Sequence, residues 1–332
     1  MKKVVLSHRL HEAGMSLLAG KVDTVVVDSG KPAHLLPALL DAAGLILRIG
    51  SIDRETMLAA KQLAVIGRPG VGVDDVDIAA ATELGIPVVI APGANTRSVA
   101  EHALALIFSA AKDILRSDRQ LRRGNFAVRN SYKAVQLQGK TLGLIGFGHI
   151  GSELAGMAKA IGLHIIVYDP FVSRAAIEGQ GYGYEPDLET VLAKADIVSL
   201  HVPLNEKTRN LIGDAQLRRM KPSAILINCA RGGVVDEPAL AAALAAGRLH
   251  SAALDVLADE PPQPDNPLLL PETIIVTPHM AGLTQEAAAG VATMAVQGVL
   301  AVLRGEIWPH VANPLAYEHE KWREAQLAQG RA

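Results

Sequence analysis

The chain of 332 residues contains a single cysteine, Cys229, and only 3% aromatic residues. One cysteine excludes an internal disulfide framework and a cysteine-rich zinc site, so no metal is expected and a reducing, cytoplasmic location is favoured. The net charge is −2 and the basic residues are scattered, which excludes an obvious nucleic-acid-binding surface. The apolar runs are interrupted short of a membrane span, and the first is too short for a signal peptide. We therefore expect a globular protein that binds neither nucleic acid nor membrane.

Hydrophobic residues make up 49% of the chain, and many of them lie in short runs rich in β-branched residues. Between these runs lie helical patterns, a rhythm that predicts βαβ units and a parallel sheet. In the first 95 residues the runs are VVLSH (4–8), VDTVVVDS (22–29), GLILRIG (44–50), LAVIGRPG (63–70) and IPVVIA (86–91). A single long helical pattern then covers residues 96–124, and we interpret it as a connector between domains.

The same rhythm restarts at residue 140. The further runs are KTLGLIGFG (140–148), HIIVYDP (164–170), DIVSLHVP (196–203), AILINCA (224–230), SAALDV (251–256) and TIIVTP (273–278). A last, alanine-rich helical pattern at 284–305 is expected to return to the first domain. The sequence thus predicts an α/β protein with two doubly wound, Rossmann-like parallel-sheet domains and a cleft between them. Residues 1–97 and 290–332 would form a flavodoxin-like substrate-binding domain, and residues 98–289 an NAD-binding Rossmann domain.

The stretch GLIGFGHIGSELAGMAKAIGLHIIVYDP (143–170) contains the pattern G-x-G-x-x-G between a predicted strand and a predicted helix. Gly146 allows the tight turn, Gly148 lets the backbone approach a pyrophosphate, and Gly151 lets the helix pack on the strand. The first N–H groups of the helix, around His149 and Ile150, would face the phosphates. The alternative interpretation is a glycine-rich turn without a ligand.

Asp169 ends the strand that follows this loop. A carboxylate at that position can accept hydrogen bonds from the ribose hydroxyls of a dinucleotide. It would also repel a 2′-phosphate. The expected cofactor is therefore NAD rather than NADP.

Three polar side chains follow predicted strands of the second domain, at the edge where open α/β sheets bind ligands. Arg231 has a planar pair of donors for a carboxylate or carbonyl, and His279 can exchange a proton near neutral pH. A carboxylate such as Glu260 can orient the imidazole and stabilise its charged form. Each could instead be an ordinary surface residue, but together they indicate an enzyme that acts on a carbonyl with a nicotinamide cofactor. Their stretches are NCARGGVVDE (228–237), LDVLADEPP (254–262) and VTPHMAG (276–282).

The chain resembles the D-isomer-specific 2-hydroxyacid dehydrogenases over essentially its whole length. The Gly146–Asp169 fingerprint, NCARGG, the DEPP turn and the PH of VTPHMAG occur in the expected order and spacing. The resemblance implies that His279 is the acid/base, Glu260 its hydrogen-bonded partner and Arg231 the substrate-orienting cation. It also implies that the cofactor is lined by Asp169 at the adenosine ribose and by Thr96, Cys229, Ala230 and Asp255.

In the first domain, the glycine-rich turn GRPGVGVDDVD (67–77) precedes a predicted helix. Its backbone N–H groups could bind the substrate carboxylate, a role that the resemblance implies for Val71 and Gly72. The alternative is a turn that only caps the helix, at Asp74 or Asp75.

Within the family, LRIGSID, VIGRPGVGVDDVD, NTRSVAEHALALI and NCARGGVVDEPAL are most similar to the phosphoglycerate dehydrogenases. That likeness makes Arg48 and Arg68 candidates for binding a substrate phosphate, with ordinary surface charge as the alternative. The stretch MAGLT (280–284) instead resembles other hydroxyacid dehydrogenases. Reduction of hydroxypyruvate or glyoxylate, a sulfonated hydroxy acid, and an NAD-sensing protein of the corepressor type therefore stay open.

The resemblance also implies a homodimer joined through the nucleotide-binding domains. Segments 96–124 and 125–139 are the candidate interface elements.

Overall fold

The computed structural model describes residues 1–323 and residue 327. The chain divides into two compact units. Unit 1 consists of Met1–Asn95 and Leu283–Ala332, and unit 2 of Thr96–Gly282. The rest of the predicted C-terminal segment, 324–326 and 328–332, lies outside the described residues.

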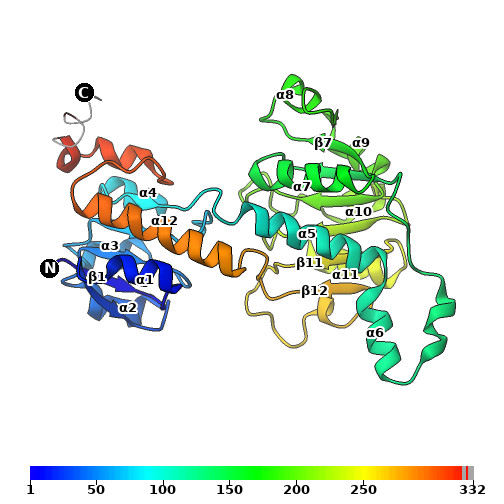
Figure 1. Cartoon of the computed structure of the whole chain (residues 1–332), viewed down its shortest axis with the longest axis horizontal. Coiled ribbons are helices and arrows are strands. Elements are labelled where there is room, and N and C mark those ends of the chain that lie inside the picture. Colours follow the sequence, from blue (N-terminus) through cyan, green and yellow to red (C-terminus); the bar gives the residue numbers. More distant parts are fainter. Residues whose placement is uncertain (324–326, 328–332) are drawn as a thin grey trace. The chain divides into compact units, whose positions relative to one another are not determined.

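Unit 1 contains a five-stranded parallel sheet in the order β2-β1-β3-β4-β5 (Figure 1). All five strands expected from the sequence are present, which confirms the α/β prediction for this unit. The strands are β1 (Lys3–Leu6), β2 (Asp23–Val26), β3 (Gly44–Ile46), β4 (Val65–Gly67) and β5 (Val88–Val89). The helices are α1 (Glu12–Leu18), α2 (Pro32–Leu39), α3 (Arg54–Ala59), α4 (Ile78–Glu83) and α12 (Gln285–Leu303), with the 3-10 turns η3 (Pro314–Glu318) and η4 (Glu320–Trp322).

The long helix α12 forms much of the core of unit 1. A Cβ added at Gly14 of α1 would lie 2.8 Å from the Cβ of Ala292, and one added at Gly67 of β4 would lie 2.6 Å from Val299. The length and composition of α12 would suit a membrane span, contrary to the expectation that every apolar run is too short. Most of the helix is buried, as expected of the core helix of a folded domain.

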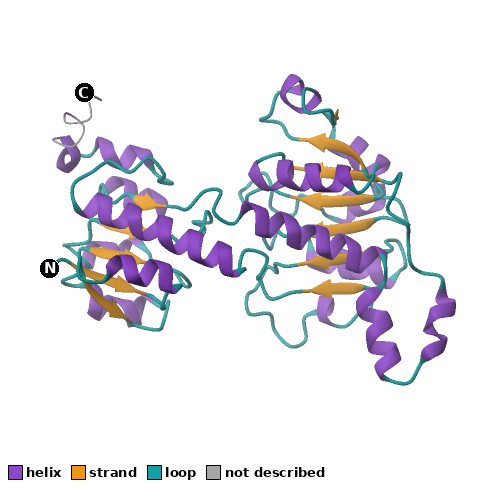
Figure 2. Cartoon of the chain, in the orientation of Figure 1, coloured by secondary structure: helices purple, strands orange, loops and turns teal. Residues whose placement is uncertain are grey.

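Unit 2 contains a seven-stranded parallel sheet in the order β12-β11-β10-β9-β6-β7-β8, with helices on both faces (Figure 2). The strands are β6 (Thr141–Ile145), β7 (His164–Tyr168), β8 (Gly183–Tyr184), β9 (Ile197–Leu200), β10 (Ile225–Asn228), β11 (Ser251–Leu254) and β12 (Ile274–Val276). Successive strands extend from β6 towards β8 on one side, and the chain then returns to β9 on the other. This reversal is the doubly wound order, which leaves a ligand-binding crevice at the carboxyl ends of β6 and β9.

The helices of unit 2 confirm the predicted alternation, with one correction. They are α5 (Thr96–Ala111), α6 (Ile114–Arg122), α7 (His149–Ala160), α8 (Arg174–Glu178), α9 (Leu188–Lys194), α10 (Asp214–Arg219) and α11 (Glu237–Ala245), with 3-10 turns η1 (Phe126–Ser131) and η2 (Pro267–Leu269). The single helix expected over 96–124 is wrong, because the chain breaks at Asp113. This residue has a φ of 54°, in the left-handed region, and its carboxylate accepts a hydrogen bond from Arg116 Nε at 3.0 Å.

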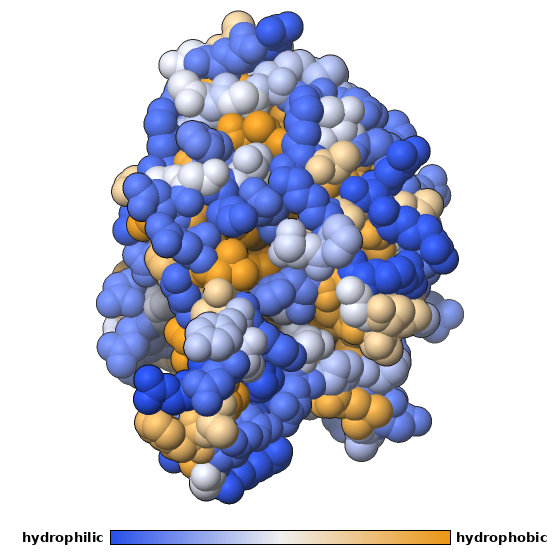
Figure 3. Space-filling model, turned by 90° about the vertical axis from the view of Figure 1, so that its right-hand side faces the viewer, coloured by the Kyte–Doolittle hydropathy of each residue, from blue (hydrophilic) through white to orange (hydrophobic). Residues whose placement is uncertain are grey.

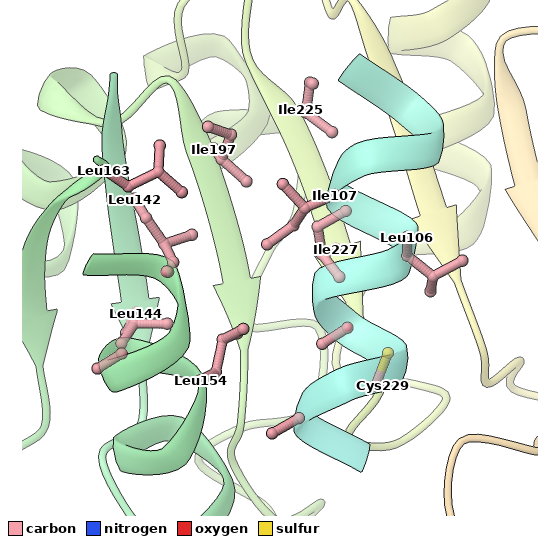
Figure 4. Close-up of a cluster of buried hydrophobic side chains, with 14 of the residues drawn as sticks. Leu106, Ile107, Leu142, Leu144, Leu154, Leu163, Ile197, Ile225, Ile227 and Cys229 are labelled. Atoms are coloured by element: carbon pink, nitrogen blue, oxygen red, sulfur yellow. The ribbon is translucent and has the colours of Figure 1, made fainter. Parts of the chain in front are cut away.

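The largest core of unit 2 lies between the sheet and the helices α5 and α7. Figure 4 shows Leu106 and Ile107 of α5 and Leu154 of α7 among side chains from the central strands. Cys229 lies in the same cluster and is buried. Burial raises the pKa of its thiol, and the nearby Asp255 raises it further. A thiol in this state is a small packing group and a poor nucleophile.

Candidate active site

The turn between β6 and α7 can pack closely against its neighbours only because Gly146 and Gly151 have no Cβ. Gly146 has a φ of 97°, and a Cβ there would lie 2.4 Å from the carbonyl oxygen of His201. A Cβ on Gly151 would lie 2.4 Å from the carbonyl oxygen of Gly146. Gly148 faces open space and precedes α7 without a side-chain cap. The first N–H groups of this helix, including those of His149 and Ile150, are therefore available to a phosphate.

Asp169 lies directly after β7 and is held beside this turn. Its Oδ2 accepts the N–H of Phe147 at 2.8 Å, and its Oδ1 accepts the N–H of Phe171 at 2.8 Å. Each carboxylate oxygen keeps a lone pair that a ribose hydroxyl can use. The fixed negative charge would disfavour a 2′-phosphate. The turn and the carboxylate together therefore fit NAD.

His279 and Glu260 meet at the carboxyl ends of β11 and β12. His279 Nδ1 lies 2.6 Å from Glu260 Oε2, and Glu260 Oε1 accepts the N–H of Leu257 at 3.0 Å. The hydrogen bond to Glu260 raises the pKa of His279 despite its partial burial. Burial opposes the charge on Glu260, but the hydrogen bonds from His279 and Leu257, together with the charges of His279 and Arg231, outweigh it and lower the pKa of the carboxyl group. The pair thus favours an imidazolium beside a carboxylate.

Arg231 belongs to the turn that follows β10. Its Nη1 donates to the carbonyl oxygen of Ala230 at 2.7 Å, and its own carbonyl oxygen accepts Nδ2 of Asn228 at 2.9 Å. The positive charge of Arg231 lowers the pKa of both Glu260 and His279, so it acts on the same pair. The structure therefore brings the three predicted residues to one edge of the unit 2 sheet.

The buried carboxylate of Asp255 shapes the loop that carries His279. It accepts the N–H groups of Met280 at 2.9 Å and Ala281 at 2.8 Å, and the hydroxyl of Thr277 at 2.5 Å. The N–H of His279 donates to the carbonyl oxygen of Asp255 at 2.8 Å. His279 has a φ of 50°, an unfavourable conformation that these surrounding bonds can maintain. Asp255 therefore positions the imidazole through the backbone.

Sequence reasoning did not single out Thr277 and His102, which complete this network. His102 of α5 has its Nε2 3.1 Å from Thr277 Oγ1, and the same nitrogen lies 3.5 Å from Asp255 Oδ1. Both residues lie inside stretches that resemble the family, VTPHMAG and NTRSVAEHALALI. No periodicity or spacing in the sequence indicates that they meet.

The other residues expected to line the cofactor have defined places in unit 2. Thr96 is the first residue of α5, Cys229 and Ala230 follow β10, and Asp255 follows β11. Their contact with NAD stays a prediction. In the part of the chain that the structure describes, no group of three or more His, Cys, Asp or Glu residues could hold a metal ion.

In unit 1, Arg68 stabilises the glycine-rich turn that follows β4. Its guanidinium donates to the carbonyl oxygens of Leu47 at 2.9 Å and Gly72 at 3.1 Å, and its Nη2 pairs with Asp75 at 3.2 Å. The side chain is only 12% exposed. These contacts give Arg68 a structural role and weaken its case as a phosphate ligand.

The cap of α4 differs from the expected one. Asp77 Oδ1 accepts the N–H of Ala80 at 2.9 Å, so Asp77 caps the helix, and neither Asp74 nor Asp75 does. Within the described residues, the N–H groups of Val71 and Gly72 have no hydrogen-bond acceptor. They can therefore bind an anion such as a carboxylate.

Arg48 follows β3 and is exposed. Its backbone N–H donates to Ser7 Oγ at 2.9 Å, and its Nη1 has one long contact, 3.5 Å, with the carbonyl oxygen of Arg9. Most of its donors are directed to solvent, as a ligand-binding side chain requires.

Comparison with known proteins identifies the family. A family model described as "D-isomer specific 2-hydroxyacid dehydrogenase, NAD binding domain" matches residues 104–281. The chain is 42% identical to the D-3-phosphoglycerate dehydrogenase of Methanocaldococcus jannaschii over 322 residues, which cover 97% of this chain and 61% of that protein. It is 45% identical to the enzyme of the same name from Archaeoglobus fulgidus over 254 residues, 76% of this chain and 48% of that protein. The chain thus spans about half to three fifths of the length of these two relatives.

Solved structures agree with this match. A protein from Thermus thermophilus superposes with a TM-score of 0.85 at 35% identity, covering 93% of this chain and 99% of the other. An NADPH-dependent glyoxylate/hydroxypyruvate reductase from Sinorhizobium meliloti, in complex with NADP and malonate, superposes with a TM-score of 0.84 at 26% identity, covering 95% of this chain and 98% of the other. The site geometry, the family model and these relatives agree, and the chain belongs to the D-isomer specific 2-hydroxyacid dehydrogenase family.

Proposed function

We propose that the protein is an NAD-dependent oxidoreductase that interconverts a D-2-hydroxy acid and its 2-keto acid, with an activity of the D-3-phosphoglycerate dehydrogenase type. One observation carries the proposal: the 2.6 Å His279–Glu260 pair, under the charge of Arg231, lies at the carboxyl edge of the sheet that also holds the Gly146–Gly151 turn. Oxidation of a 2-hydroxy acid requires an acid/base, a cation and a dinucleotide-binding turn, and all three lie at this edge of the sheet.

The proton chemistry belongs to His279. Because Glu260 occupies Nδ1, Nε2 is the atom that faces a substrate, and about half of the imidazole is exposed. Bound NAD would supply the acceptor for the hydride of C2 of the hydroxy acid, and its reduced form would supply the hydride for the keto acid. In oxidation, neutral His279 takes the hydroxyl proton at Nε2, and Glu260 stabilises the resulting imidazolium. In reduction, the imidazolium gives that proton to the keto oxygen.

Arg231 and the turn of unit 1 would hold the substrate. The guanidinium can pair with the carboxylate or polarise the C2 oxygen through its planar donors. The N–H groups of Val71 and Gly72, which lack an acceptor among the described residues, supply a second anion site. Arg48 offers a further cation for a phosphate. Thr96, Cys229, Ala230 and Asp255 are proposed to line the cofactor.

A second candidate is reduction of hydroxypyruvate or glyoxylate, or oxidation of a sulfonated hydroxy acid. The stretch MAGLT after His279 and the likeness to the Sinorhizobium meliloti reductase favour the first of these. An NAD-sensing protein of the corepressor type is the alternative of another class. It would bind NADH without turning over a keto acid.

We further propose a homodimer joined through the arm formed by α6 and η1. Neither α6 (Ile114–Arg122) nor η1 (Phe126–Ser131) contains a buried residue. Leu121, Phe126 and Tyr132 are exposed on it. The base of the arm and the starts of β11 and β12 line an open pocket of about 370 Å³. Figure 3 shows hydrophobic residues exposed among hydrophilic ones on the face that it presents. A second copy would cover such side chains.

The single cysteine supports a reducing, cytoplasmic compartment.

The activity is tested by an absorbance assay that follows NADH with a panel of acids. The panel contains 3-phosphoglycerate, phosphohydroxypyruvate, hydroxypyruvate, glyoxylate, pyruvate and sulfopyruvate, with both isomers of each hydroxy acid. We expect turnover of the D isomers and preference for the phosphorylated pair. Preference for an unphosphorylated or sulfonated acid would select the second candidate. Tight NADH binding without turnover would select the sensing role.

A further inference from the structure

Three turns of unit 1 lie side by side at the carboxyl edge of its sheet. They follow β1, β3 and β4, which are neighbours in the register Leu6↔Ile46↔Gly67. The ladder continues for one more residue, because Ser7 N–H donates to Ile46 O at 3.0 Å and Leu47 N–H donates to Gly67 O at 2.9 Å. The next residues, His8 and Arg48, are therefore adjacent at this edge. The turn that carries Val71 and Gly72 comes next in the row.

The hydroxyl of Ser7 lies against the His8 imidazole. Its hydroxyl oxygen is buried and accepts the N–H groups of Arg48 at 2.9 Å and Ile49 at 3.4 Å. The hydroxyl hydrogen is then available to His8 Nδ1, which lies 3.2 Å from this oxygen. When Nδ1 accepts, Nε2 of the neutral ring carries the hydrogen. In the described part of the chain, this N–H has no acceptor, so it can donate to a ligand.

Two carboxylates at or beside these turns already form salt bridges. Glu12 contacts Arg9 at 3.0 Å, and Asp75 contacts Arg68 at 3.2 Å. Among residues 1–323 and 327, no carboxylate forms a salt bridge with Arg48. His8 is half-buried and Arg48 exposed, so the donors of both side chains remain accessible from solvent.

We propose that His8 is a specificity-determining residue that binds, together with Arg48, an anionic group on C3 of a three-carbon 2-hydroxy acid. The inference rests on the proposed function and names the substrate class, an acid with a phosphate or sulfonate at C3. Adjacent strands are ~4.8 Å apart, so His8 lies about one spacing from Arg48 at the ends of β1 and β3, and the Val71–Gly72 turn follows β4, the next strand. The carboxylate and the C3 anion of such an acid are separated by on the order of one spacing, within reach of both side chains. A two-carbon acid such as glyoxylate has no group that reaches His8.

The test compares His8→Ala with the wild type on phosphohydroxypyruvate, sulfopyruvate and hydroxypyruvate, with NADH as the reductant. Loss of one hydrogen bond to an anion should raise KM for the charged acid by roughly 10- to 100-fold, with kcat nearly unchanged. KM for hydroxypyruvate should not change. His8→Gln keeps a neutral donor near the position of Nε2 and should lose less. Lys21→Ala is the control, because Lys21 is exposed at the amino end of β2, the opposite edge of the same sheet.

Each outcome separates the inference from the function on which it rests. A larger loss with the phosphorylated acid assigns phosphate, and a larger loss with sulfopyruvate assigns sulfonate. An equal change for all three acids, or no change, overturns the role of His8 and leaves the proposed function standing. A wild-type protein that turns over none of the three acids overturns the proposed function and the inference with it.

Discussion

The imidazole of His279 and the carboxylate of Glu260 form a hydrogen bond of 2.6 Å between loops that follow different strands of the unit 2 sheet. The bond raises the pKa of His279, and together with the Leu257 N–H and the charges of His279 and Arg231 it keeps the pKa of Glu260 lowered despite burial. It places Nδ1 against the protein and leaves Nε2 for a substrate. We therefore expect the pH dependence of the reaction to depend on Glu260.

Replacement of Glu260 by Gln should shift the pH profile of keto-acid reduction to lower pH. Reduction needs protonated His279, so its rate falls as pH rises through the pKa of His279. Glu260 raises that pKa, and the Gln variant should return it towards its ordinary value. The oxidation profile should move in the same direction, because neutral His279 is then available at lower pH. Steady-state kcat against pH in both directions measures the shift, and a profile that does not move would show that Glu260 does not tune His279.

Replacement of Asp169 by Ala should relax the preference for NADH over NADPH. The carboxylate is held by the N–H groups of Phe147 and Phe171, so it is fixed where a 2′-phosphate would be repelled. We expect the ratio of kcat/KM for NADH to that for NADPH to fall about tenfold or more. The two coenzymes are compared with one keto acid. A ratio that stays at the wild-type value would remove Asp169 from the ribose site.

Replacement of Thr277 by Val should loosen the loop that carries His279. The variant leaves buried Asp255 without one of its three donors, and His102 without the hydroxyl near its Nε2. We expect a loss of about 1–3 kcal/mol in the free energy of unfolding and a lower kcat, with KM for NADH little changed. Thr190→Val is the control, since Thr190 bonds Asp187 at an exposed helix start. Wild-type kcat in the Thr277 variant would mean that Asp255 alone positions the loop.

Replacement of Arg68 by Ala should destabilise the protein, whereas replacement of Arg48 should not. Arg68 donates to two carbonyl groups and to Asp75 from a largely buried position, so its loss should cost about 1–3 kcal/mol. That corresponds to a fall in Tm of roughly 2–12 °C for a chain of this size. Thermal unfolding of both variants gives the comparison. If the two variants have equal Tm values, Arg68 does not stabilise the fold and is an ordinary surface charge.

The order of strands and helices follows from local sequence, and its exceptions have physical reasons. β-branched runs predict the strands, but β8 (Gly183–Tyr184) is a two-residue edge strand without such a run. The break at Asp113 contains neither glycine nor proline. It depends on a left-handed aspartate whose carboxylate binds Arg116, a contact that periodicity does not predict.

In the site, too, some features follow from local sequence and others depend on tertiary contacts. Arg231, Glu260 and His279 could be found because each follows a predicted strand, and parallel strands deliver such residues to one edge. The contacts that position these three residues could not be predicted from the sequence. Thr277 meets His102 only after α5 packs on the sheet, and His8 and Arg48 come to neighbouring strand ends only through the order of β1 and β3. These pairings depend on tertiary structure and have no local signature.

Replacement of His279 by Ala tests the account most directly, with kcat for keto-acid reduction and the Kd for NADH measured on the same sample. Removal of the acid/base should lower kcat by roughly 10²- to 10⁴-fold. The Kd for NADH should stay at the wild-type value, because the Gly146–Gly151 turn and Asp169 lie in other loops. Turnover at the wild-type rate in this variant would contradict the assignment of His279 as the acid/base.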